Sequence, residues 1–88
     1  MSTTTISNIA VTTKGQVPGN VEVTVTADVA NRNGQTPEAY FPAQSMATPM
    51  TNSSGTEWTA SNTEMYDGGE KTIKIECNGV NASKGFKP

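Results

Sequence analysis

Residues 21–29, VEVTVTADV, contain the longest unbroken alternation of apolar and polar positions in the chain. The odd-numbered positions hold four valines and Ala27, while the even-numbered positions hold Glu, Thr or Asp. Successive side chains of a β-strand point to opposite faces, so this pattern predicts a strand that is buried on one face of an antiparallel sheet.

A second strand of the same kind is predicted over residues 71–78, KTIKIECN, with Ile73, Ile75 and Cys77 on its apolar face. We expect this face to cover the valine face of residues 21–29. Residues 55–62, GTEWTASN, resume the alternation and place Trp58 and Ala60 on one face. These segments account for most of the predicted core.

A first strand is predicted around Ile9 and Val11. Ile6 is out of phase with these two residues, which predicts a kink near Ser7 and Asn8. Ser2 to Thr5 are polar, and residues 1–5 are predicted to form a flexible arm. At the other end, residues 80–88 form either a last short strand around Phe86 or a tail.

The middle of the chain contains Pro37, Pro42 and Pro49. Each proline lacks an N–H group, so a long central strand cannot run through this region. Residues 38–41 are predicted as a short edge strand. Residues 44–54, QSMATPMTNSS, are predicted as a loop, and a loop of this length is a candidate functional or interface segment.

Turn dipeptides separate the predicted strands at spacings of roughly ten residues, among them Asn33-Gly34, Asp67-Gly68 and Asn78-Gly79. Thr and Ser are abundant and Leu is absent, which favours strands over helices. We therefore predict an all-β fold, a single domain over residues 1–88, and an immunoglobulin-like sandwich of two antiparallel sheets with six to seven short strands.

Residues 55–81, GTEWTASNTEMYDGGEKTIKIECNGVN, resemble the C-terminal half of the bacterial and phage immunoglobulin-like domains. Residues 9–13 followed by VEVTVTADV are similar to the first two strands of the same domains. The chain differs from antibody domains because it has no pair of cysteines, and from the bacterial pattern in its proline-rich middle and short C-terminus. The resemblance implies a non-catalytic role, either as a spacer or adhesive module or as a decoration or accessory domain of a phage particle.

The amino-acid composition argues against several classes of partner and activity. The formal net charge is −2, from six basic and eight acidic residues, which argues against a nucleic-acid partner. There is one cysteine, Cys77, and no histidine, so we expect no metal site, no cofactor and no enzymatic activity. No apolar run is long enough to span a membrane. The first ten residues lack the charged and apolar regions of a signal peptide.

Most of the residues that could bind a ligand or take part in a reaction are better explained by a role in the fold. We predict that Trp58 and Cys77 lie in the core. The DVANRNG stretch from Asp28 and the Asp67 to Glu70 segment are read as turns rather than cation sites. Tyr40 and Phe41 lie beside prolines in the predicted edge strand, and at least one of them is expected in the core. The candidate interface residues are Tyr40, Phe41, Met46, Met50 and Phe86.

The leading hypothesis is a structural or accessory protein of a phage particle, made in the host cytoplasm and located in the virion. Its partner would be a capsid or tail lattice, or a second copy of the chain. A carbohydrate-binding or adhesive module of a bacterial cell-surface protein is the second hypothesis, and exposed aromatic rings would favour it. The third is a small phage-encoded inhibitor of a host protein.

Overall fold

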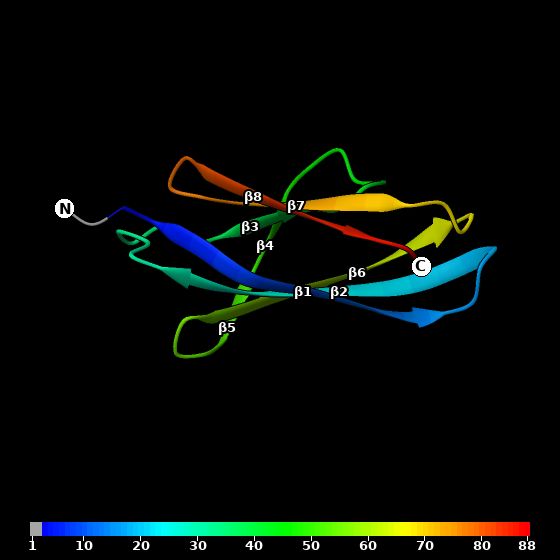
Figure 1. Cartoon of the computed structure of the whole chain (residues 1–88), viewed down its shortest axis with the longest axis horizontal. Helices are drawn as coiled ribbons and strands as arrows, with labels where there is room; N and C mark the ends of the chain where they lie inside the picture. Colours follow the sequence, from blue (N-terminus) through cyan, green and yellow to red (C-terminus); the bar gives the residue numbers. More distant parts are fainter. Residues whose placement is uncertain (1–2) are drawn as a thin grey trace.

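The computed structural model describes residues 3–88, which form eight strands and no helix (Figure 1). The strands are β1 (Thr5–Gly15), β2 (Gly19–Ala30), β3 (Glu38–Tyr40), β4 (Thr48–Pro49), β5 (Thr51–Ser54), β6 (Glu57–Tyr66), β7 (Lys71–Cys77) and β8 (Val80–Phe86). They form two antiparallel four-stranded sheets, which confirms the predicted fold class. Eight strands are present where we predicted six or seven, because the proline-rich middle contributes three.

Sheet A has the strand order β1-β2-β6-β5, and sheet B has the order β4-β3-β7-β8. With the two-residue β4 counted as an addition beside β3, this is the ABED and CFG arrangement of the immunoglobulin constant-type fold. The two sheets face each other in an elongated sandwich of 46 × 23 × 18 Å, with the start of β1 and the C-terminus toward opposite ends (Figure 1).

The core lies between β2 of sheet A and β7 of sheet B. The four valines of β2 and Ala27 are at most 2% exposed, and Ile73, Ile75 and Cys77 of β7 are equally buried. Trp58 and Ala60 of β6 complete the layer from sheet A. The structure confirms that the valine face of β2 packs against the apolar face of β7. It also confirms that Trp58 and Cys77 lie in the core.

The turns follow the predicted dipeptides. Asn78 and Gly79 have φ angles of 50° and 79° and form the two-residue turn between β7 and β8, as expected of an Asn-Gly hairpin. Gly15, at the end of β1, has a φ of 135°, and a Cβ atom there would lie 2.7 Å from the carbonyl oxygen of Asn20. A side chain at this position would therefore clash with the backbone of β2.

The kink predicted in the first strand is a β-bulge. The register of β1 against β2 shifts between Ser7 and Ala10, and Asn8 has a φ of 52°. The Asn8 side chain is held by a 2.7 Å hydrogen bond from its Nδ2 to Asp28 Oδ2. Because a bulge inserts one extra residue, Ile6 and Val11 both face β2 valines although their numbers differ in parity.

Three expectations for the ends and the middle need correction. The predicted loop over residues 44–54 contains β4 and β5, and β3 is not an edge because β4 lies beyond it. Thr4 is 3% exposed, and its Oγ1 donates to the carbonyl oxygen of Asn31 at 2.6 Å. The flexible arm predicted over residues 1–5 is thus wrong for Thr4 and Thr5, and residues 1–2 lie outside the described residues. Residues 80–86 form a full last strand, β8.

The two methionines of the middle segment offer a test of this fold. Met50 is 4% exposed in the core, whereas Met46 is 76% exposed on the β3–β4 connection. We expect Met50→Ala to lower the free energy of unfolding by about 2–5 kcal/mol, because it removes buried contacts and leaves a cavity. Met46→Ala should change it by less than about 0.5 kcal/mol. Urea unfolding followed by Trp58 fluorescence measures both, and equal effects of the two substitutions would contradict the fold.

Candidate protein-docking surface

The two lateral sides of the sandwich are closed in different ways. On one side, residues 48–54 pass from sheet B to sheet A, pairing first with β3 and then with β6. Met50 lies at the crossover, with its N–H donating to the carbonyl oxygen of Pro37 at 2.9 Å. The chain itself therefore covers the core on this side.

The opposite side is bounded by β1 and β8, which are edge strands of different sheets and pack beside each other without pairing. Four hydrophobic side chains pack against the core here but are only partly buried, and all four belong to these two strands. They are Ile6, Ile9, Val11 and Phe86. We call the surface formed by these four residues the β1–β8 side. These side chains contact the core and are also partly exposed to solvent, and we refer to them together as the apolar strip.

The bulge in β1 creates much of this strip. Without the extra residue, Ile6 and Val11 would point to opposite faces of sheet A. With it, both face inward along an edge that no other strand of the described residues covers. The hydrogen bond between Asn8 and Asp28 fixes the bulge and therefore helps to position the strip.

Phe86, at the far end of the strip, is supported by a buried polar pair. The Tyr66 ring meets the Phe86 ring edge to face, with centroids 6.0 Å apart. The Tyr66 hydroxyl in turn donates a hydrogen bond to Glu64 Oε1. Burial, that hydrogen bond and the Glu64 charge together raise the pKa of Tyr66, so the hydroxyl stays protonated and remains a donor.

Glu64 is 6% exposed, and its second oxygen, Oε2, has no hydrogen-bond partner among the described residues. Asn62 Nδ2, two residues earlier on the same face of β6, is also without one. Buried polar groups in this condition lower stability. The Tyr66 hydroxyl is therefore the protein contact that offsets part of the cost of burying Glu64.

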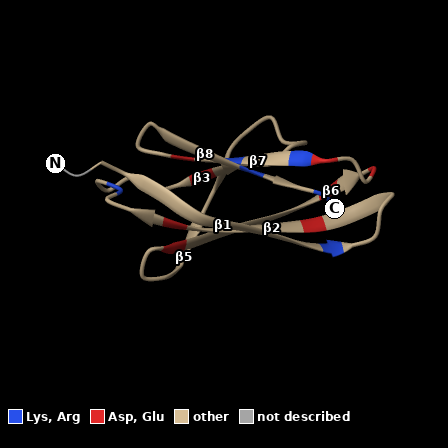
Figure 2. Cartoon of the chain, viewed as in Figure 1, with Lys and Arg blue, Asp and Glu red and all other residues tan. Residues whose placement is uncertain are grey.

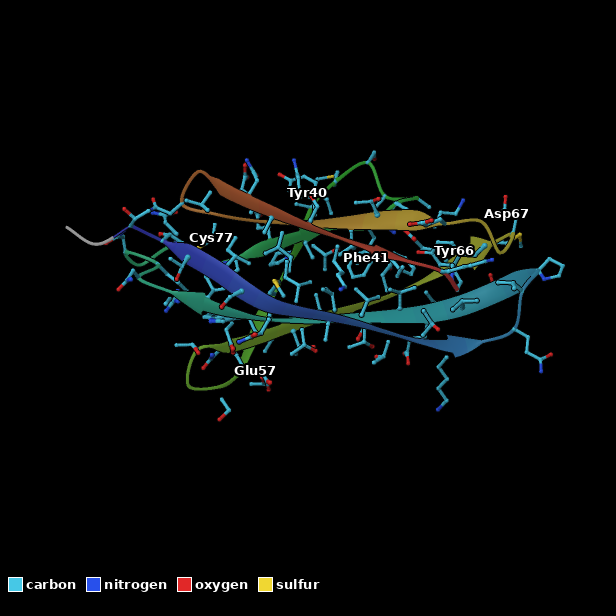
Figure 3. All side chains as sticks on the ribbon, in the orientation of Figure 1. Tyr40, Phe41, Glu57, Tyr66, Asp67 and Cys77 are labelled. Atoms are coloured by element: carbon cyan, nitrogen blue, oxygen red, sulfur yellow. The ribbon has the colours of Figure 1, made fainter. Side chains whose placement is uncertain are left out.

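The five predicted interface residues do not form one surface. Phe86 lies on the β1–β8 side. Phe41 and Met50 are 2% and 4% exposed, so their prediction as exposed docking residues is wrong. Their side chains fill the space between the sheets, and Figure 3 shows Phe41 there. Met46 is exposed on the β3–β4 connection.

Tyr40 is partly exposed on the outer face of sheet B (Figure 3). Its hydroxyl donates to Glu76 Oε1 at 3.4 Å, and Lys74 Nζ lies 4.4 Å from its ring centroid. The Glu76 charge, followed by burial and the Glu38 charge, raises the pKa of Tyr40. The ring is thus held in a surface cluster of its own strand and β7, separate from Phe86.

Ile6, Ile9 and Val11 were not predicted as surface residues, because Ile9 and Val11 alternate like core positions. The signal that could have identified them is topological. The first and last strands of this sandwich are edges, and inward side chains on an edge strand have neighbours on one side only. Hydrophobic periodicity alone does not carry that information.

Cys77 lies in the core and Asp67 lies in the connection between β6 and β7, as predicted. Of the DVANRNG stretch that was predicted as a turn, Asp28 to Ala30 belong to β2 and only residues 31–34 lie outside it. Asp67 Oδ1 accepts from the Gly69 N–H at 3.0 Å and lies 3.4 Å from Lys71 Nζ, and these contacts lower the pKa of Asp67. Burial raises the pKa of Cys77, against a smaller opposite effect of Arg32. The Arg32 guanidinium also lies 4.5 Å from the Trp58 ring centroid, so it covers the indole at one end of the core.

Charged residues of both signs are scattered along the strands (Figure 2). Within residues 3–88 there is no pocket, no cluster of three metal-ligating side chains and no helix able to cross a membrane. Comparisons with protein-family models, with curated proteins and with solved structures found no match for the chain.

The role of the Glu64–Tyr66 pair can be tested by a double-mutant cycle. Tyr66→Phe should lower the free energy of unfolding by about 1–3 kcal/mol, because it leaves the buried carboxylate without a donor. Adding Glu64→Met to Tyr66→Phe should recover at least part of that loss, since no buried charge remains. Urea unfolding measures all variants, and a double variant that is less stable than Tyr66→Phe would contradict the assignment.

Proposed function

We propose that the chain is a non-enzymatic structural or accessory protein of a phage particle, either a capsid decoration subunit or a tail-associated subunit. It is made in the host cytoplasm and acts in the virion by docking on other protein subunits. The assignment to a phage particle rests on the resemblance of residues 55–81 to bacterial and phage immunoglobulin-like domains. The docking role rests on the β1–β8 side.

The observation that carries the docking role is that the core reaches the surface along two edge strands with no strand partner on their outer side. Fully burying a large apolar side chain contributes about 1.5–3 kcal/mol, so a partner that covered four half-buried side chains would gain several kcal/mol. The unpaired backbone groups of an edge strand can also add to the sheet of a neighbour. Both contributions would be made by the same surface.

A small domain has a further reason to dock. An 88-residue chain buries a smaller fraction of its surface than a large domain does, and it is correspondingly marginal in stability. Any partner that binds the folded state raises its apparent stability. Docking through the β1–β8 side would therefore also stabilise the subunit in a particle.

The carbohydrate-binding hypothesis gains no support from the aromatic residues. Phe41 is 2% exposed and Trp58 is 9% exposed. Tyr40 is left as a single partly exposed ring, and Lys74 already lies over it. No specific observation favours a sugar-stacking surface over protein docking.

The proposal is tested by co-sedimentation of the purified chain with purified phage capsids and tails. We expect stoichiometric binding by the natural chain. Ile9→Lys, which places a charge on the β1–β8 side, should weaken binding at least tenfold. Thr63→Lys, the same new side chain on the exposed outer face of sheet A, should leave binding unchanged.

Circular dichroism of both variants checks that they remain folded. If the natural chain stayed in the supernatant with purified capsids and also with purified tails, the proposal would be refuted. Capture of one host protein in equal amount, with no particle binding, would instead support the inhibitor hypothesis.

A further inference from the structure

The four edge strands of the sandwich are not equally protected against pairing with another chain. β4 has two residues and contains Pro49, and β5 has four residues and a register shift between Asn52 and Ser54. Short strands, prolines and bulges are the usual means by which proteins prevent edge pairing. The two edges on the closed side of the sandwich therefore carry such protection.

β8 is protected in a different way. Lys84 pairs with Ile73, so it lies on the core-facing side of the edge strand rather than on the outer face. A charge that points inward from an edge would be buried if another strand were added there. Gly85, the next residue, also weakens β8 as a template for pairing.

The second half of β1 has none of these features. Residues 10–14 pair regularly with residues 22–26 of β2, after the bulge and without a proline. The one charge in this segment, Lys14, pairs with Glu22 on the outer face of sheet A. All other members are Ala, Val or Thr, and the run presents an unprotected edge on the β1–β8 side.

We propose that a second copy of the chain pairs with this edge, antiparallel, about a two-fold axis at Thr12. The inference rests on the proposed function in one respect, since it takes the β1–β8 side as the docking surface. It names the occupant and the mode of contact. The two sheets A would then join into one continuous eight-stranded sheet.

The sequence of the edge favours a second copy because it is complementary to itself in this register. Thr12 lies opposite Thr12 of the second copy, Val11 lies opposite Thr13, and Ala10 lies opposite Lys14. Paired residues share a face, as they must in an antiparallel ladder, and no like charges are opposite each other. Thr–Thr and β-branched pairs of this kind are among the favourable cross-strand combinations.

The symmetry also brings the partly buried side chains together. A two-fold axis through Thr12 places Val11 of each copy along the same inner seam, next to Thr13 of the other. A strand pair of this length buries less surface than a standard stable interface of about 1,600 Å². We therefore expect a dimer that dissociates on dilution rather than a permanent one.

Sedimentation velocity over a range of protein concentrations tests this proposal. The natural chain should shift from monomer to dimer as concentration rises. Thr13→Lys copies onto β1 the inward charge that Lys84 provides on β8, and it should weaken dimerisation at least tenfold. Thr51→Lys, at an exposed position of the β5 edge, should dimerise as the natural chain does. Circular dichroism confirms that both variants are folded.

Cysteine cross-linking then tests the register. Thr12→Cys should form a disulfide-linked dimer on mild oxidation, because directly opposed residues of an antiparallel pair have closely spaced Cβ atoms. Thr51→Cys should not, and Cys77 is too buried to compete.

A natural chain that stays monomeric at all concentrations, or equal effects of Thr13→Lys and Thr51→Lys, would overturn the inference. Particle binding is measured separately, at concentrations where the chain is a monomer, because a second copy and a particle would compete for the β1–β8 side. Chains that stay monomeric and bind particles refute only the dimer, and chains that dimerise when concentrated but ignore particles when dilute refute only the proposed function.

Discussion

The structure depends on one apolar layer, in which the valines of β2 face Ile73, Ile75 and Cys77 of β7. These side chains are almost completely buried, and each comes from the inner face of a strand that has a neighbour on both sides. Because β2 is 12 residues long and each sheet has four strands, the sandwich is long and narrow. A narrow sandwich has little chain available to cover its lateral sides, and residues 48–54 cover only one of them.

The same constraint explains which parts of the fold the sequence could predict. Where a strand has one buried and one solvated face, alternation reports it directly, as in β2 and β7. The phase break at Ile6 likewise predicted a kink, and the structure shows that this kink is a bulge, in which one extra residue changes the parity of the inward positions. These features are local, and each is set by a few adjacent residues.

What the sequence could not predict depends on position in the sheets. β5 has no apolar alternation because all four of its residues are exposed, and Met50 is buried because the chain changes sheets there. Phe41 precedes a proline and Phe86 follows a glycine, so the sequence around them is similar in kind. Phe41 nevertheless lies in the core, whereas Phe86 lies on an edge strand. That difference is decided by contacts between distant segments.

Glu64 and Tyr66 show that the core is not shaped by burial alone. A one-residue slip of β6 would move both side chains to the outer face and bring Glu57 and Met65 inward, so the pair belongs to a single register. The pair supports Phe86, and through it the end of the β1–β8 side. The hydrogen bond between Asn8 and Asp28 has a comparable role at the bulge. Polar contacts thus position the apolar strip that we propose for docking.

Hydrogen exchange of the backbone amides, resolved by residue, tests most directly the claim that the core is fixed by β2 and β7 and left open along β1. In dilute solution we predict that the backbone amides of β2 and β7 exchange slowest. Within residues 10–14, the amides whose N–H groups point away from β2 should exchange rapidly. Raising the protein concentration should protect those β1 amides and leave β5 unchanged. Slow, concentration-independent exchange throughout β1, or new protection in β5 instead, would contradict the account.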